Sequence, residues 1–110
     1  MIQRRELLAS SLGAALLSAV GMAQAQSTKP VRIVVPFAAG GVQDTLARAL
    51  SQEMSAALGQ TVIVENRAGA GGTIGTGYVA RADADGTVMV AAAASHNIAG
   101  SLYTKLAYDP

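Results

Sequence analysis

The segment VVPFAAGGVQDTLARAL, residues 34–50, joins an apolar run to an amphipathic helical pattern through two adjacent glycines. A short apolar run predicts a buried strand, and the 3.6-residue spacing that follows predicts a helix. The first N–H groups of a helix lack intrahelical partners, and glycines before them let an anion approach. The segment therefore predicts an α/β fold with a ligand-accepting loop after its first strand.

The same alternation of elements continues along the chain. Strands are predicted at 31–37, 61–66 and 87–94. One predicted helix ends before Gly59, and a second covers 73–82. This spacing predicts an α/β fold built on a parallel β-α-β-α-β half-sheet. Right-handed crossovers place the loops that follow the strands at one sheet edge, where open α/β sheets bind ligands. These loops are 38–44, 67–72 and 95–98.

The amino terminus has the features of an export signal. Arg4 and Arg5 precede an apolar run over 7–22, which leads to a small-x-small site ending at Ala25. This pattern predicts a signal peptide over 1–25, a periplasmic location, and a folded part over 26–110. The arginine pair partly fits a twin-arginine signal, so general secretion and twin-arginine export both remain open.

Cysteine content and charge exclude several classes of protein. The chain has no cysteine, so no disulfide framework supports it. Its net charge of +1 arises within the predicted signal peptide, and residues 26–110 carry equal numbers of acidic and basic side chains. Without a basic cluster, no nucleic-acid partner is expected.

Two side chains near the predicted ligand edge each have two interpretations. Asp44 either caps its own helix or contacts a ligand. His96, the single histidine, is either a structural hydrogen-bonding residue or a binding residue. The chain has no cysteine nucleophile, Gly-x-Ser-x-Gly elbow or metal-ligand cluster, so we expect a binding protein, not an enzyme, with no cofactor and no metal.

A near-match to a dinucleotide-binding fingerprint occurs at GTGYVA, residues 75–80. It lies inside a predicted helix instead of following a strand. We interpret Gly75, Gly77 and Ala80 as positions for close helix–sheet packing. The alternative function is a nucleotide-dependent α/β enzyme fragment, and a third possibility is a structural or interaction protein.

The runs KPVRIVVPFAAGG, LGQTVIVENRAGAGGTIG and SHNIAGSLYTKLAYDP, in this order, resemble one family over residues 29–110. It is the family of substrate-binding receptors of tripartite tricarboxylate transporters, the Bug receptors. The resemblance implies a periplasmic-binding-protein-like (type II) fold. It also implies two domains that close around a small carboxylate, dicarboxylate or tricarboxylate and deliver it to membrane permease subunits.

The resemblance further implies ligand-binding positions in the loops after the first and third strands, with the glycine loop 69–72 bordering the cleft. Backbone N–H groups, small hydroxyls and bridging water hold the carboxylate there. The corresponding positions in this chain are Phe37, Ala39, Gly40, Gly41, Gln43, Asp44, Ser95 and His96.

Two residues depart from the family pattern, which has a third glycine and then Thr or Ser. Val42 resists a positive φ, and Gln43 donates through a longer side chain than a hydroxyl.

The resemblance also implies that residues 26–110 are the amino-terminal part of the first domain, with a truncated sheet and the second domain absent. Strand edges and apolar helix faces would then be uncovered. We expect weak or no ligand binding by such a chain. Both a monomer and edge-driven self-association remain open.

Overall fold

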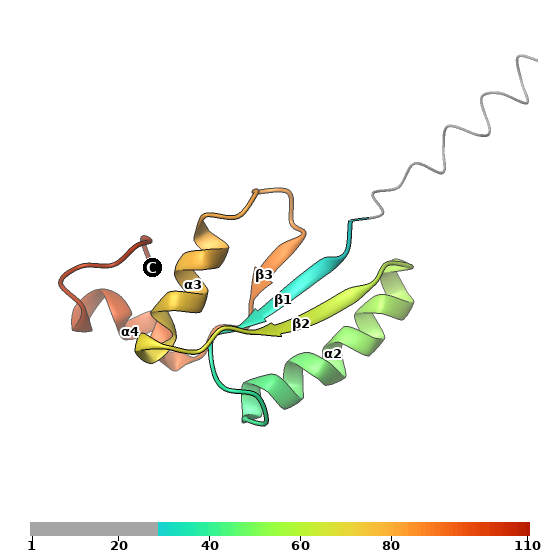
Figure 1. The fold of residues 1–110 in the computed structure, drawn as a ribbon, viewed down its shortest axis with the longest axis horizontal. Coiled ribbons are helices and arrows are strands. Elements are labelled where there is room, and N and C mark those ends of the chain that lie inside the picture. The colour runs from blue at the N-terminus through green and yellow to red at the C-terminus, as the bar shows by residue number, and fades with distance from the viewer. Residues whose placement is uncertain (1–28) are drawn as a thin grey trace, which may run out of the picture.

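The computed structural model describes residues 29–110, drawn in colour in Figure 1. The predicted signal peptide therefore lies outside the described residues. None of the helices in 29–110 has the length and apolar character needed to cross a bilayer. The elements are β1 (Val31–Val35), α2 (Val42–Leu58), β2 (Val62–Asn66), the short 3₁₀ turn η2 (Ala70–Gly72), α3 (Thr73–Ala80), β3 (Val88–Val90) and α4 (Ala94–Leu102).

The three strands form one parallel sheet in the order β2-β1-β3. In the register, Arg32 lies opposite Ile63 on one side and Val88 on the other. The central position of β1 explains its composition, because a strand paired on both sides and covered on both faces must be apolar. The predicted parallel β-α-β-α-β half-sheet is confirmed.

Helices cover both faces of the sheet (Figure 1). Ile33 and Val35 point to one face and form the core with Ala47 of α2. Val34 points to the opposite face and is fully buried where α3 packs against β1 and β3. Successive side chains of a strand alternate between faces, so this short strand supplies both layers of the core.

Two predicted boundaries are wrong at the ligand edge. The first strand ends at Val35, not residue 37, because Pro36 has no N–H to continue the ladder. The third strand ends at Val90, and α4 begins at Ala94. The alanines of 91–94 favour helix over strand. Ser95 and His96 therefore lie in the first turn of α4 and not in a loop.

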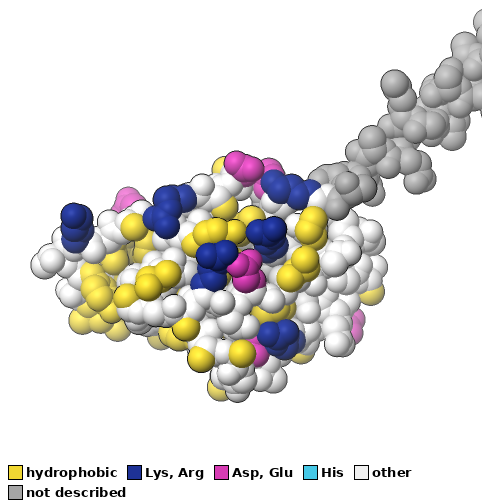
Figure 2. Space-filling model, viewed as in Figure 1, with side chains coloured by type: hydrophobic (Ala, Val, Ile, Leu, Met, Phe, Trp, Pro, Cys, Tyr) yellow, Lys and Arg dark blue, Asp and Glu magenta, His cyan; other side chains and the backbone are white. Residues whose placement is uncertain are grey.

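The apolar residues whose spacing predicts α2 are only partly buried. Ala47 is 2% exposed, whereas Leu46 and Leu50 are 58% and 57% exposed. The helix packs mainly over β2 and β1, so these leucines border an open apolar groove of about 320 Å³ between α2 and β3. Uncovered apolar surface, as predicted, is also present at α4, where Figure 2 shows yellow side chains gathered at the left of the molecule.

The glycines of α3 differ in their roles. A Cβ on Gly75 would lie 2.8 Å from the Arg67 carbonyl oxygen and 2.9 Å from Pro36 Cβ, which confirms close packing of α3 on the end of β1. A Cβ on Gly77 would instead make ordinary contacts with Ala107, and Ala80 is exposed. The prediction of sheet packing is wrong for these last two positions, because Gly77 faces the carboxyl-terminal segment and Ala80 faces solvent.

Candidate functional site

The loop between β1 and α2 is closed by the carboxylate of Asp44. The Gly40 N–H donates to Asp44 Oδ2 at 2.9 Å, and Gly40 has φ +89°, which only glycine adopts without strain. Asp44 is 5% exposed. The Asp44 side chain thus bonds a backbone N–H just before its own helix, whereas α2 itself has no side-chain capping bond, and contact of Asp44 with a ligand stays a prediction.

Two further side chains complete this cluster. Arg48 Nε donates to the Asp44 carboxylate at 3.1 Å, and Asn66 Nδ2 donates to it at 3.0 Å and to the Phe37 carbonyl oxygen at 3.2 Å. Sequence reasoning did not single out Arg48 or Asn66. The i,i+4 spacing of Asp44 and Arg48 is a signal that could have found the first, whereas the Asn66 contact joins segments 22 residues apart.

The ionisation of Asp44 follows from these contacts. The hydrogen bonds from Arg48, Gly40 and Asn66 lower the pKa of Asp44 to about 2. The side chain is therefore a carboxylate at neutral pH, and the guanidinium of Arg48 offsets its charge. This pairing reduces the repulsion that an incoming anion would meet at the start of α2.

The start of α2 leaves backbone donors unpaired. The first intrahelical bond runs from the Thr45 N–H to the Gly41 carbonyl oxygen at 3.0 Å, so the N–H groups of Val42, Gln43 and Asp44 precede it. Among residues 29–110, no protein acceptor bonds these three groups. Val42 is 71% exposed and has helical backbone angles. Because this position has no positive φ, valine in place of the family's glycine causes no backbone strain here.

The glycine loop after β2 packs against the loop after β1. Gly72 has φ +95°, and a Cβ there would lie 3.4 Å from Phe37 Cζ, so the phenyl ring borders the loop. The Tyr103 hydroxyl donates to the Ala70 carbonyl oxygen at 3.3 Å, which ties the loop to the segment after α4. The glycine loop and Phe37 thus form one continuous surface.

Ser95 and His96 lie beside this surface. With Gly71, Gly72 and Thr76 they line a cavity of about 10 Å³. The His96 ring stacks on Tyr108, with ring centroids 5.8 Å apart and an interplanar angle of 13°. The His96 Nδ1 atom is buried without a hydrogen-bond partner.

The predicted positions therefore fall into two neighbouring groups at the carboxyl edge. Phe37, Gly40 and Asp44 are linked through Asn66, with Ala39 and Gly41 exposed on the same loop. Ser95 and His96 form the second group at the start of α4. The Gln43 side chain lies apart from both, lining the apolar groove with Leu46 and Ala92.

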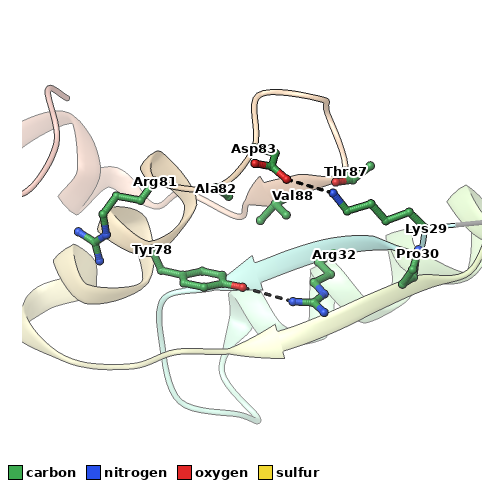
Figure 3. A pocket seen from close by; sticks show the side chains of 9 residues that line it. All are labelled: Lys29, Pro30, Arg32, Tyr78, Arg81, Ala82, Asp83, Thr87 and Val88. Carbon is green, nitrogen blue, oxygen red and sulfur yellow. Dashed lines mark hydrogen bonds and ion pairs between the residues drawn. The ribbon is translucent and has the colours of Figure 1, made fainter. Parts of the chain in front are cut away.

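Another hollow lies at the opposite, amino-terminal edge of the sheet (Figure 3). It has a volume of about 360 Å³, and Figure 3 shows Tyr78 reaching from α3 toward Arg32 on β1, with 3.3 Å between its hydroxyl and Arg32 Nη1. Lys29 is paired there with Asp83 and Asp85, and the bond to Asp85 raises the pKa of Lys29. Internal pairing and location both disfavour this hollow as the main ligand site.

Comparison with solved structures places the fold among periplasmic binding proteins. A periplasmic transporter matches 78% of this chain with 45% identity and a TM-score of 0.70, over 29% of its own length. The periplasmic binding protein BugD matches 56% of this chain with 59% identity and a TM-score of 0.54, over 20% of its own length. MatC from Rhodopseudomonas palustris, with bound malate, matches 59% with 45% identity and a TM-score of 0.56, over 22% of its own length.

Sequence comparison gives the same assignment. An Agrobacterium vitis UPF0065 protein from the TAR-I ttuE-ttuC' intergenic region is 45% identical over 104 residues, or 94% of this chain. The chain spans about 30% of the length of that relative. The family profile described as tripartite tricarboxylate transporter family receptor matches residues 46–110, which is more than half of the chain. The chain belongs to the tripartite tricarboxylate transporter receptor family.

Proposed function

We propose that this chain is the amino-terminal part of a periplasmic receptor that binds small carboxylates for a tripartite tricarboxylate-type transporter. The observation that carries the proposal is the set of unpaired N–H groups of Val42, Gln43 and Asp44 at the carboxyl edge of the sheet. Such groups, at the positive end of a helix dipole, favour a bound carboxylate. MatC, with its bound malate, is a relative whose ligand has this chemistry.

The proposed ligand-binding positions act together at this edge. A carboxylate oxygen accepts from the start of α2, where Gly40 and Gly41 carry no side chain. The start of α4 supplies a second helix end, with Ser95 as a hydroxyl donor. The binding positions that we propose are Phe37, Ala39, Gly40, Gly41, Gln43, Asp44, Ser95 and His96.

Binding and delivery need no bond-making step, so the proposal is a receptor and not an enzyme. Export through the predicted signal peptide over 1–25 would bring the chain to the periplasm, and the permease subunits of the transporter would be its membrane partners. Residues 29–110 would form one wall of the cleft, since the chain corresponds to about 30% of a relative's length. We therefore propose that this chain alone binds weakly, since small-molecule sites bury most of the ligand surface.

A comparison of ligands by thermal unfolding tests the proposal. A ligand at ten times its Kd stabilises a domain by about 1.4 kcal/mol, or roughly 5–10 °C in Tm for a chain this small. We expect malate and longer dicarboxylates, at concentrations up to the millimolar range, to raise the Tm, and a neutral amide of the same acid to leave it unchanged. A rise in Tm with NAD and not with any acid would instead favour a nucleotide-dependent enzyme fragment.

The apolar groove between α2 and β3 predicts self-association of this chain. Leu50→Lys places a charge in the groove at a side chain that is 57% exposed, so we expect a lower apparent mass with little change in Tm. Sedimentation velocity over a range of protein concentrations would measure it. Leu102→Lys, at a leucine that is 66% exposed on α4, is the matched control. Unchanged association of Leu50→Lys, or an equal loss in both variants, would contradict a specific contact through the groove.

A further inference from the structure

The His96 ring contains a hydrogen-bonding atom that the protein leaves unused. Nδ1 is buried without a partner, and the Tyr108 ring stacked on His96 offers it no hydrogen-bonding group through its face. Buried ring nitrogens nearly always have a partner, because removal from water without one is costly. Nδ1 is therefore available to bond a partner that is not a protein atom.

The surroundings of the ring fit one water molecule. The adjoining cavity has a volume of about 10 Å³, close to the minimum for a single water. Its lining includes hydroxyl-bearing Thr76, which is 7% exposed, and Ser95, together with Gly71 and Gly72. A buried water makes two to four hydrogen bonds, and this lining provides hydroxyl and backbone groups for them.

We propose that this cavity holds one internal water that donates a hydrogen bond to His96 Nδ1 and is also bonded to the Thr76 hydroxyl. The water would join the start of α4 to α3 beneath the glycine loop. Because Nδ1 then acts as an acceptor, the neutral ring carries its hydrogen on Nε2. His96 is thus a positioning residue whose tautomer is set from inside the protein.

The fixed tautomer of His96 would also affect which ligands bind nearby, an inference that rests on the proposed function. A ring held with its hydrogen on Nε2 has an N–H donor and no acceptor at that atom, so wherever Nε2 meets a ligand it favours an anion over a cation. The water and the tautomer are properties of the unliganded chain. Their test is therefore independent of whether a carboxylate binds.

Long-range ¹H–¹⁵N NMR of the unliganded chain at about pH 8, where an ordinary histidine is neutral, distinguishes the two tautomers. We expect a single population with the hydrogen on Nε2, and a cross-peak between a long-lived water and the His96 ring protons. A ring with its hydrogen on Nδ1, an even mixture of tautomers, or the absence of the water cross-peak would each overturn the proposal.

Substitution of the second water partner gives an independent readout. Thr76→Val removes the hydroxyl, and we expect loss of the water cross-peak and a mixture of tautomers. Thr73→Val is the matched control in the same helix, because the Thr73 hydroxyl donates to Ala70 instead of lining the cavity. A retained water cross-peak in folded Thr76→Val would contradict the bridge. If that variant does not fold, the NMR measurement on the unsubstituted chain still tests both the tautomer and the presence of the water.

Discussion

The Asp44→Ala variant is expected to melt roughly 10 °C below the unsubstituted chain. The Asp44 carboxylate accepts hydrogen bonds from Gly40, Arg48 and Asn66. Removing it leaves these donors without their acceptor and releases the loop at the start of α2. Circular dichroism melting would measure the change. Asp109→Ala, at an exposed carboxylate near the chain end, is the matched control and should leave the Tm unchanged.

The same residue predicts a specific pH dependence. The pKa of Asp44 is lowered from 3.8 to about 2 in the folded chain, first through the bond from Arg48. Its stabilising contribution is therefore present above about pH 4 and is lost as the pH falls toward 2. Urea unfolding between pH 6 and pH 2 should show a steeper loss of stability for the unsubstituted chain than for Asp44→Ala. Parallel curves would contradict the role assigned to this carboxylate.

The Gly75→Ala variant is expected to lower the free energy of unfolding by about 2 kcal/mol. Alanine gains up to about 1 kcal/mol over glycine within a helix, whereas overpacking costs about 1–3 kcal/mol. The cost lies at the upper end here, because the added Cβ meets the Arg67 carbonyl at 2.8 Å and Pro36 at 2.9 Å. Neither the backbone nor the proline ring can turn aside.

Gly77→Ala makes the same substitution two residues later in α3 and is the control. Its added Cβ would meet Ala107 and Arg81 at 3.5 Å, an ordinary contact distance. We therefore expect this variant to be as stable as the unsubstituted chain or slightly more stable. Urea unfolding measures both variants. Equal effects at the two positions would refute the close approach of α3 to the end of β1.

The fold was predictable because its elements follow local rules. The β-branched runs and the helical spacing predicted three parallel strands and two crossover helices, and the parallel pairing agrees. The strand order β2-β1-β3 was not predicted. The ends of elements were less predictable. Ala91 to Ala94 continue an apolar run, and only the extent of pairing with β1 decides that β3 stops at Val90.

The candidate site was predictable by location and less so by contact. The glycine loop and the start of α2 were expected at the carboxyl edge, and the structure places them there. The bond from Asn66 to Asp44 joins residues far apart in sequence, so no local pattern reveals it. The burial of Ala47 in place of Leu46 and Leu50 depends on how far the sheet extends beneath α2.

An amide ¹H–¹⁵N NMR titration of this chain with malate tests the central claim most directly, because it detects weak binding and also locates it. A carboxylate held at the carboxyl edge predicts concentration-dependent shifts of the Val42, Gln43 and Ser95 amides. Shifts confined to Arg32 and Tyr78, around the hollow at the opposite edge, would contradict the proposed site.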